Sequence, residues 1–210
     1  MSSESNTQSV LHFFTRHKKT IQWIFYGQYL YIMGLVGYSA YLTNLQIHRS
    51  LVYEWGKISG IFALIYFALS LLPGIARRFK FTSSITQILM LFRRQIGTTA
   101  FLFGLFHYLA LRMLPILLAG VPLNFNPPVF EVLGFLSLYP MTLLFLTSND
   151  LSVQKMGVWW RRVHSLAYII AWTIFLHVAL QGRVILMYAI GLVALFETVS
   201  LVYFQIKKRG

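Results

Sequence analysis

The sequence predicts an all-α polytopic membrane protein, a bundle of six transmembrane helices with both termini in the cytoplasm. Of the 210 residues, 57% are hydrophobic and 11% are charged. In a soluble domain roughly a quarter of the residues are charged. Apolar runs long enough to cross about 30 Å of hydrocarbon recur along the chain. Basic residues lie in clusters between these runs, as the positive-inside rule describes.

Six apolar segments are predicted to span the membrane as helices, because backbone groups in lipid must be hydrogen-bonded within the segment. A seventh apolar stretch, 81–92, is too short to span and predicts an interfacial connector. The fourth span contains Pro140, where we expect a kink. The six spans are 21–42, 58–75, 95–118, 129–147, 163–180 and 184–204.

This pattern predicts one transmembrane domain, residues 21–205. A polar cytoplasmic segment, 1–20, precedes it and a basic cytoplasmic tail, 206–210, follows it. No secretory signal peptide is visible before the first span, which we expect to act as its own insertion signal. The expected location is therefore the cell (inner) membrane, with the lipid bilayer as a partner.

The distribution of positive charge predicts the orientation. Fourteen of the 18 Lys and Arg residues fall on one predicted side, which the positive-inside rule makes cytoplasmic. The net charge of +13 therefore reflects topology, and we expect no nucleic-acid partner. The cytoplasmic set is Arg16, Lys18, Lys19, Arg77, Arg78, Lys80, Arg93, Arg94, Lys155, Arg161, Arg162, Lys207, Lys208 and Arg209.

Three histidines lie in apolar segments, where an ionisable side chain is a functional-site hypothesis. His107 lies 13 residues beyond Arg94, which is about 20 Å deep at 1.5 Å per residue. His177 lies 15 residues beyond Arg162, which is about 22 Å deep by the same rise. His107 and His177 therefore share a depth in the outer half of the membrane, whereas His164 lies near the inner face.

The matched pair predicts two ligands of one metal. The chain contains no cysteine, so a metal must be bound through imidazole or carboxylate groups. Haem iron takes axial imidazoles, and a flat haem gripped from both faces suits histidines on two helices. We therefore predict His107 and His177 as haem ligands in an electron-transfer protein. The alternative is that each histidine only hydrogen-bonds a neighbouring carbonyl.

The other candidate site residues surround this pair. Haem propionates need cationic partners, and Arg112 and Arg183 lie five and six residues outward of the two predicted ligands. At the inner face, Arg94 is a candidate near His164, although setting topology is an alternative role for an inner arginine. His164 lies about 140° away from the helix stripe of the outer ligand, so geometry alone does not favour a second haem there.

Two carboxylates lie within predicted spans. Glu197 is in the middle of the sixth span, where a carboxylate is costly unless it is paired or protonated. We expect it either to be neutral and hydrogen-bonded within the bundle or to relay protons. Glu131 lies one turn inside the fourth span, and we expect its side chain to reach outward to water.

Two motifs resemble the ferric-reductase-like transmembrane superfamily, and most closely its haem-binding membrane subunits of bacterial periplasmic methionine-sulfoxide reductase systems. The resemblance covers about residues 55–180. The first motif is Arg93-Arg94-Gln95-Ile96-Gly97 leading to His107. The second is Thr147-Ser148, Lys155-Met156-Gly157, Trp160, His164, Tyr168 and His177.

The resemblance implies a six-helix domain that binds haem b between the third and fifth helices, with His107 and His177 as one ligand pair. It also marks His164 as a ligand of a second, inner haem. In the related NADPH oxidases a second histidine on the third helix completes that inner site, and here Arg94 or Arg93 stands at the corresponding position. FMN is implied by the resemblance alone, since no phosphate-cradling glycine loop is visible.

The predicted function is a haem b subunit that passes electrons across the membrane to an external soluble reductase, such as a methionine-sulfoxide reductase. We expect no nicotinamide domain on this chain, so a cytosolic flavin reductase or quinol is the expected electron donor. One alternative is a stand-alone transmembrane reductase of ferric or other metal ions. A second alternative is a non-redox transporter or assembly factor.

Overall fold

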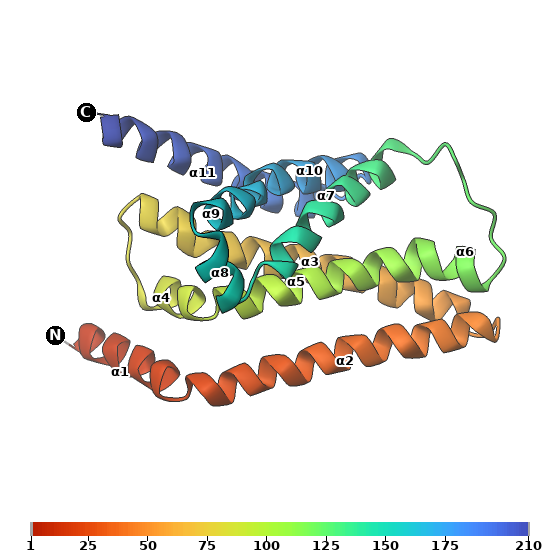
Figure 1. Ribbon diagram of the computed structural model, residues 1–210, viewed down its shortest axis with the longest axis horizontal. Coiled ribbons are helices and arrows are strands. Elements are labelled where there is room, and N and C mark those ends of the chain that lie inside the picture. The colour runs from red at the N-terminus through yellow and green to blue at the C-terminus, as the bar shows by residue number, and fades with distance from the viewer. Residues whose placement is uncertain (1, 210) are drawn as a thin grey trace.

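The computed structural model describes residues 2–209, and every regular element in that range is a helix (Figure 1). The all-α prediction is confirmed for these residues. In chain order the elements are α1 (Ser2–Arg16), α2 (Lys18–Asn44), α3 (Arg49–Arg78), α4 (Ser84–Leu91), α5 (Arg93–Tyr108), η1 (Leu109–Met113), α6 (Leu114–Leu118), α7 (Val129–Leu146), α8 (Asp150–Met156), α9 (Val158–His164), α10 (Leu166–Leu180) and α11 (Val184–Arg209).

The long helices run back and forth along one direction, so the predicted basic clusters gather at one end of the bundle. The starts of α2 and α5 and the ends of α3 and α11 lie at the same end, on the left in Figure 1. We call this the basic end. The opposite end carries the turn after α2, the loop 119–128 and the turn between α10 and α11.

Five helices are long and apolar enough to cross a membrane, and α2 is not among them. The five are Arg49–Arg78, Arg93–Leu118, Val129–Leu146, Val158–Leu180 and Val184–Lys208. The first predicted span, 21–42, lies inside α2, a helix of 27 residues. Its tyrosines, glycines and glutamines lower its mean hydropathy, although residues 20–44 carry no charge.

Helix α2 nevertheless packs on the bundle through a few buried contacts. Ile32 is fully buried on the face that α2 turns to its neighbours. Gln28 donates a hydrogen bond to the Tyr66 hydroxyl on α3 at 3.0 Å. The Tyr29 hydroxyl donates to the carbonyl of Gln95 on α5 at 3.1 Å. These bonds connect α2 to both central helices.

Short helices and turns complete the basic end. The apolar connector forms α4, which Ser83 and Thr86 begin with a reciprocal capping box. The membrane-crossing segment Val158–Leu180 contains the fifth predicted span. It is interrupted at Ser165, which divides it into α9 and α10. Gly157 joins α8 to α9 at φ +51° and ψ −112°, a conformation that a side chain disfavours. Pro140, the position of the predicted kink, lies within the continuous helix α7.

Candidate functional site

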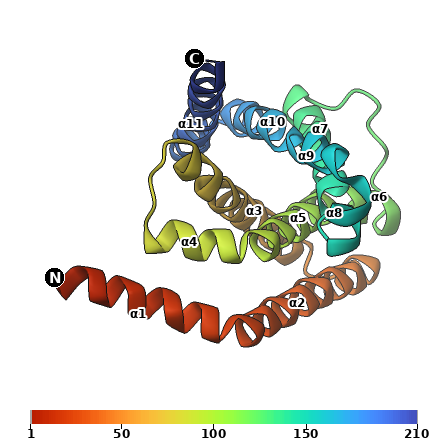
Figure 2. The ribbon, with the colours of Figure 1, turned by 60° about the vertical axis from the view of Figure 1, so that its left-hand side comes forward.

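The structure brings the two histidines of matched depth together. The rings of His107 on α5 and His177 on α10 have their centroids 6.3 Å apart, with their planes at 87°. Across the described residues, α5 and α10 do not pack backbone against backbone, because α7 and α3 flank them. The two histidine rings therefore meet although the backbones of their helices do not, and Figure 2 shows the ribbons of α5 and α10 on different sides of the bundle.

Each imidazole is held by a backbone carbonyl of a different helix. His107 Nδ1 lies 2.8 Å from the carbonyl oxygen of Gly56 on α3. His177 Nδ1 lies 2.6 Å from the carbonyl oxygen of Phe130 on α7. A carbonyl only accepts, so each Nδ1 carries the proton and donates it. The neutral ring then keeps a free lone pair on Nε2, the form in which histidine binds a metal.

The side-chain amide of Gln181 supports this tautomer at His177. Its nitrogen lies 2.9 Å from His177 Nε2, so the amide donates and the imidazole nitrogen accepts. Gln181 follows His177 by four residues, a spacing that places both side chains on one helix face. The four-residue spacing of His177 and Gln181 is the sequence signal for this contact.

Glycines on the neighbouring helices make room for both rings. A Cβ on Gly60 of α3 would lie 2.7 Å from His107 Nδ1, closer than real contacts allow. A Cβ on Gly134 of α7 would lie 3.0 Å from atoms of the His177 ring. Gly56 and Gly60 form a GxxxG spacing, which lets membrane helices approach closely. This spacing is the sequence signal that identifies the face of α3 on which His107 packs.

The helix widens just beyond His107. Residues Leu109–Met113 form a π-helical turn, and Pro115 follows within the next turn. A proline has no N–H for the carbonyl four residues before it, and single π-turns of this kind are common at functional sites. A Cβ on Gly56 would lie 2.8 Å from Leu111, so the wide turn packs closely on α3.

Two of the three predicted arginine partners already have carboxylate partners. Arg112 Nε lies 3.4 Å from Glu131 Oε2, and the Glu131 side chain remains 32% exposed. Arg94 pairs with Asp150 at 2.6 Å. That hydrogen bond, and then the charge of Arg94, lower the pKa of Asp150 below its usual range. Arg183 is exposed in the turn between α10 and α11.

His164 lies at the other end of the bundle and has different partners. Its Nε2 is 3.1 Å from the Thr147 hydroxyl, and its ring stacks on Trp160 with centroids 4.0 Å apart. Trp160 Nε1 in turn donates to the Thr147 carbonyl at 2.9 Å. The turn at Gly157 positions this group, which explains why Gly157, Trp160 and His164 occur together in the second motif.

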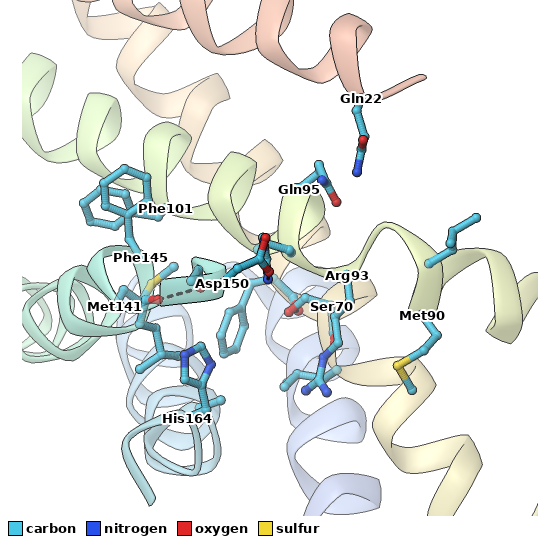
Figure 3. Close-up of a pocket in the computed structure, with 18 of the residues that line it drawn as sticks. Gln22, Ser70, Met90, Arg93, Gln95, Phe101, Met141, Phe145, Asp150 and His164 are labelled. Atoms are coloured by element: carbon cyan, nitrogen blue, oxygen red, sulfur yellow. Dashed lines mark hydrogen bonds and ion pairs between the residues drawn. The ribbon is translucent and has the colours of Figure 1, made fainter. Parts of the chain in front are cut away.

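A cavity of about 480 Å³ opens beside His164 at the basic end (Figure 3). Figure 3 shows His164 and Arg93 in the lower part of the view, with Met90 beside Arg93 and Gln22 at the top. Helices α2, α3, α4, α5, α7 and α10 all contribute to its wall. We call it the inner cavity. The structure does not bring His164 together with the outer pair.

A buried ion pair connects α3, α10 and α11. Arg78 donates to Glu197 Oε1 at 2.9 Å, to the Ser200 hydroxyl at 3.0 Å and to the Tyr168 hydroxyl at 2.6 Å. Glu197 is 1% exposed. Glu197 is thus hydrogen-bonded within the bundle, as expected, and its partner is an arginine 119 residues away in the chain.

Comparison with known proteins places this arrangement in a family. The family model described as "Ferric reductase like transmembrane component" matches residues 59–176. The chain belongs to the ferric-reductase-like transmembrane family. The matched range contains His107 and His164, and His177 follows its last residue directly. The superfamily resemblance drawn from the two motifs is confirmed, and this family member is a multi-pass inner-membrane protein.

Curated relatives of this family member carry a more specific name. A protein of Brucella ovis named protein-methionine-sulfoxide reductase heme-binding subunit MsrQ is 31% identical over 164 residues, 74% of this chain and 71% of that protein. A protein of the same name from Rhizobium meliloti is 30% identical over 96 residues, 45% of this chain and 44% of that protein. No solved structure matches the chain.

Proposed function

We propose that this protein is a membrane electron-transfer subunit that binds one haem b between His107 and His177. The observation that carries the proposal is the neighbouring pair of imidazoles, each with its Nδ1 hydrogen-bonded to a backbone carbonyl. The relatives named heme-binding subunits of a methionine-sulfoxide reductase support the same reading. Electrons would pass outward to an external soluble reductase of that kind.

The residues fit a haem iron. With an imidazole–metal bond of about 2.0 Å, two rings on opposite sides of one metal stand with their centroids roughly 6 Å apart. The observed separation is 6.3 Å. Both rings are in the tautomer that leaves Nε2 free, and Gln181 would give up its contact with His177 Nε2 to the metal. Arg183 and Arg112 lie at the same end of the bundle as the two histidines, where they would pair with the haem propionates.

The protein's own contribution is to hold the two ligands. His107 and His177 would hold the haem, which would supply a one-electron carrier. Carbonyls that accept from Nδ1–H fix the ring orientation and make Nε2 a stronger ligand. Gly60 and Gly134 keep the rings close to the neighbouring helices, so that the ligand positions follow the helix packing.

We infer one haem and keep His164 as the candidate ligand of a second. Its Nε2 is already bonded to Thr147, and α5 presents Arg93 and Arg94 where related proteins have a histidine. An inner haem would require the His164 ring to leave both Thr147 and Trp160. Binding of FMN is supported only by the family resemblance. The electron donor, a cytosolic flavin reductase or quinol, would act at the basic end.

We also propose that α2 is a sixth span with both termini in the cytoplasm. Its 27 residues cover about 40 Å at 1.5 Å per residue. The two ends of the described chain lie at the same end of the bundle as the basic clusters (Figure 1). The chain would therefore cross the membrane an even number of times. The opposite end would face the external partner, and there Phe125 in the loop 119–128 is 90% exposed.

A reduced-minus-oxidised absorption spectrum of the purified protein, with haem quantified per chain, tests the proposal. We expect a b-type spectrum at one haem per chain. A colourless protein would refute it and favour a transporter or assembly factor. A second measurement distinguishes the proposed function from a stand-alone metal reductase. It compares the rates at which the reduced protein passes electrons to ferric chelates and to a methionine-sulfoxide reductase.

Gly60→Ala is expected to weaken haem binding by about tenfold or more, the range typical for loss of a histidine's outer-shell support. The added Cβ would displace the His107 ring from the Gly56 carbonyl, since it would lie 2.7 Å from Nδ1. The effect is measured as the fraction of haem that the protein retains when apomyoglobin is added as a competing haem acceptor. Gly97→Ala on α5 is the matched control, because a Cβ there meets nothing within 4 Å. Equal haem retention in both variants would contradict the packing argument.

A further inference from the structure

We propose that the loop 119–128 is the docking surface for the external reductase, and that Phe125 is the side chain that anchors the partner. The proposal rests on the proposed function, which supplies the partner, and adds the surface that meets it. Phe125 is 90% exposed, the largest exposed fraction of any large hydrophobic side chain in the part of the chain that the structure describes. Aromatic side chains are enriched at the centres of protein interfaces.

The loop begins outside the hydrocarbon region, so lipid tails do not account for its exposed side chains. Leu118, where the helix before the loop ends, lies 24 residues beyond Arg94 at the basic end, which is about 36 Å at 1.5 Å per residue. The hydrocarbon core is about 30 Å thick. Asn124 and Asn126 flank Phe125, and asparagine side chains are mostly exposed to water. Phe125 therefore projects into the aqueous space on the outer side.

Hydrogen bonds restrain the loop. Gln46, in the turn after α2, donates to the carbonyl of Leu118 at 3.1 Å. The carbonyl of Asn124 accepts from Arg112 at 3.4 Å, and the Asn124 side-chain oxygen accepts from the N–H of Asn126 at 2.9 Å. Two prolines follow, and their rings fix the backbone angle φ. A loop that is already held in its shape loses less conformational entropy when a partner binds.

The end of the loop leads directly to His177. Phe130, five residues after Phe125, accepts a hydrogen bond from His177 Nδ1 at its backbone carbonyl, and the rings of Phe130 and His177 have their centroids 6.2 Å apart. Figure 1 shows the loop connecting the end of α6 to the start of α7 at the end opposite the basic end. A reductase on this loop would therefore contact the segment that positions one of the proposed haem ligands, which keeps the path for an outgoing electron short.

The charge at this end favours an acidic partner. Both carboxylates of the outer end are paired with basic side chains. Arg49 and Arg183 are exposed, and within residues 2–209 neither has a carboxylate partner. A second copy of this chain would present the same positive charge and be repelled. A partner with carboxylates around an apolar pocket would instead be attracted, and like charges would select against others.

Binding of the soluble methionine-sulfoxide reductase from the same organism to the full-length protein in detergent, measured by biolayer interferometry, tests the proposal. We expect Phe125→Ser to weaken binding by about tenfold or more, the range for truncating a central interface residue. Phe81→Ser is the matched control, because it removes a phenylalanine that is 63% exposed in the turn after α3 at the basic end, and it should leave the affinity unchanged.

Charge reversal tests the electrostatic part. Arg49→Glu should slow association with the reductase, because a charge at the rim of an interface acts mainly on the association rate. Arg161→Glu reverses an exposed arginine at the basic end and should not change that rate. Raising the salt concentration should slow association of the parent and bring it toward the rate of Arg49→Glu. Haem per chain and far-UV circular dichroism should match the parent in every variant.

Several outcomes would overturn the proposal. Equal affinity of the parent and Phe125→Ser, or an equal loss in Phe81→Ser, would remove the anchor. Quenching of Phe125→Trp fluorescence by lipids with brominated acyl chains would assign the side chain to the membrane, and we expect none. A homodimer that Phe125→Ser dissociates would make the loop a contact between copies. A haem-loaded parent that binds no reductase would also contradict the surface, whereas a colourless parent that binds through Phe125 would support it and refute only the proposed function.

Discussion

Replacing His177 with alanine is expected to abolish the haem absorption band, and His107→Ala is expected to abolish the same band. Each variant removes one of the two imidazoles whose centroids lie 6.3 Å apart. Loss of an outer-shell partner of a metal-bound histidine already costs about 10–100-fold in affinity, so loss of the ligand itself should cost more. The measurement is haem per chain by pyridine haemochrome assay after purification.

Two further histidine variants make this test specific. His12→Ala removes an exposed histidine on α1 and should retain all of the haem. His164→Ala removes the ring stacked on Trp160 at the other end of the bundle, and at least part of the haem should remain. If His107→Ala and His177→Ala both kept full haem, the shared iron between α5 and α10 would be ruled out.

Depth along a helix can be counted from a sequence, and this is why the meeting of His107 and His177 could be predicted. Each histidine was placed by its distance from a basic cluster, and the structure has the two rings at one level. The direction in which a side chain points around its helix cannot be counted in this way, because it depends on how neighbouring helices pack. The carbonyls of Gly56 and Phe130 that hold the rings were therefore not predicted.

Pairing between distant segments was the other part that the sequence did not reveal. Glu131 stays partly exposed, as expected, but its pairing with Arg112 of the widened turn was not predicted. The basic cluster at the end of α3 was interpreted as topology, yet Arg78 from that cluster turns inward to Glu197. A positive-inside pattern predicts the side of the membrane on which arginines lie. It does not say which of them is drawn into the bundle by a buried carboxylate.

Glu197→Ala is expected to lower the free energy of unfolding by about 3–5 kcal/mol, the cost of leaving one partner of a buried ion pair uncompensated. Arg78 and Glu197 have side chains 10% and 2% exposed, so water cannot replace the lost charge. In the part of the chain that the structure describes, Glu197 Oε2 has no partner, which leaves Arg78 as the carboxylate's side-chain donor. For a chain of this size the loss corresponds to a fall in melting temperature on the order of 10 °C.

Thermal unfolding of the detergent-solubilised protein, followed by tryptophan fluorescence, measures this effect. Glu54→Ala breaks an exposed pair with Lys57 and should change stability by about 0–1 kcal/mol. The double variant Arg78→Met with Glu197→Leu removes both charges and should recover most of the loss, because an apolar pair of similar volume avoids the buried unpaired charge. A Glu197→Ala protein as stable as the parent would show that the carboxylate does not hold α3 to α11. If Glu197→Gln kept stability but slowed electron transfer, the proton-relay role would account for this residue instead.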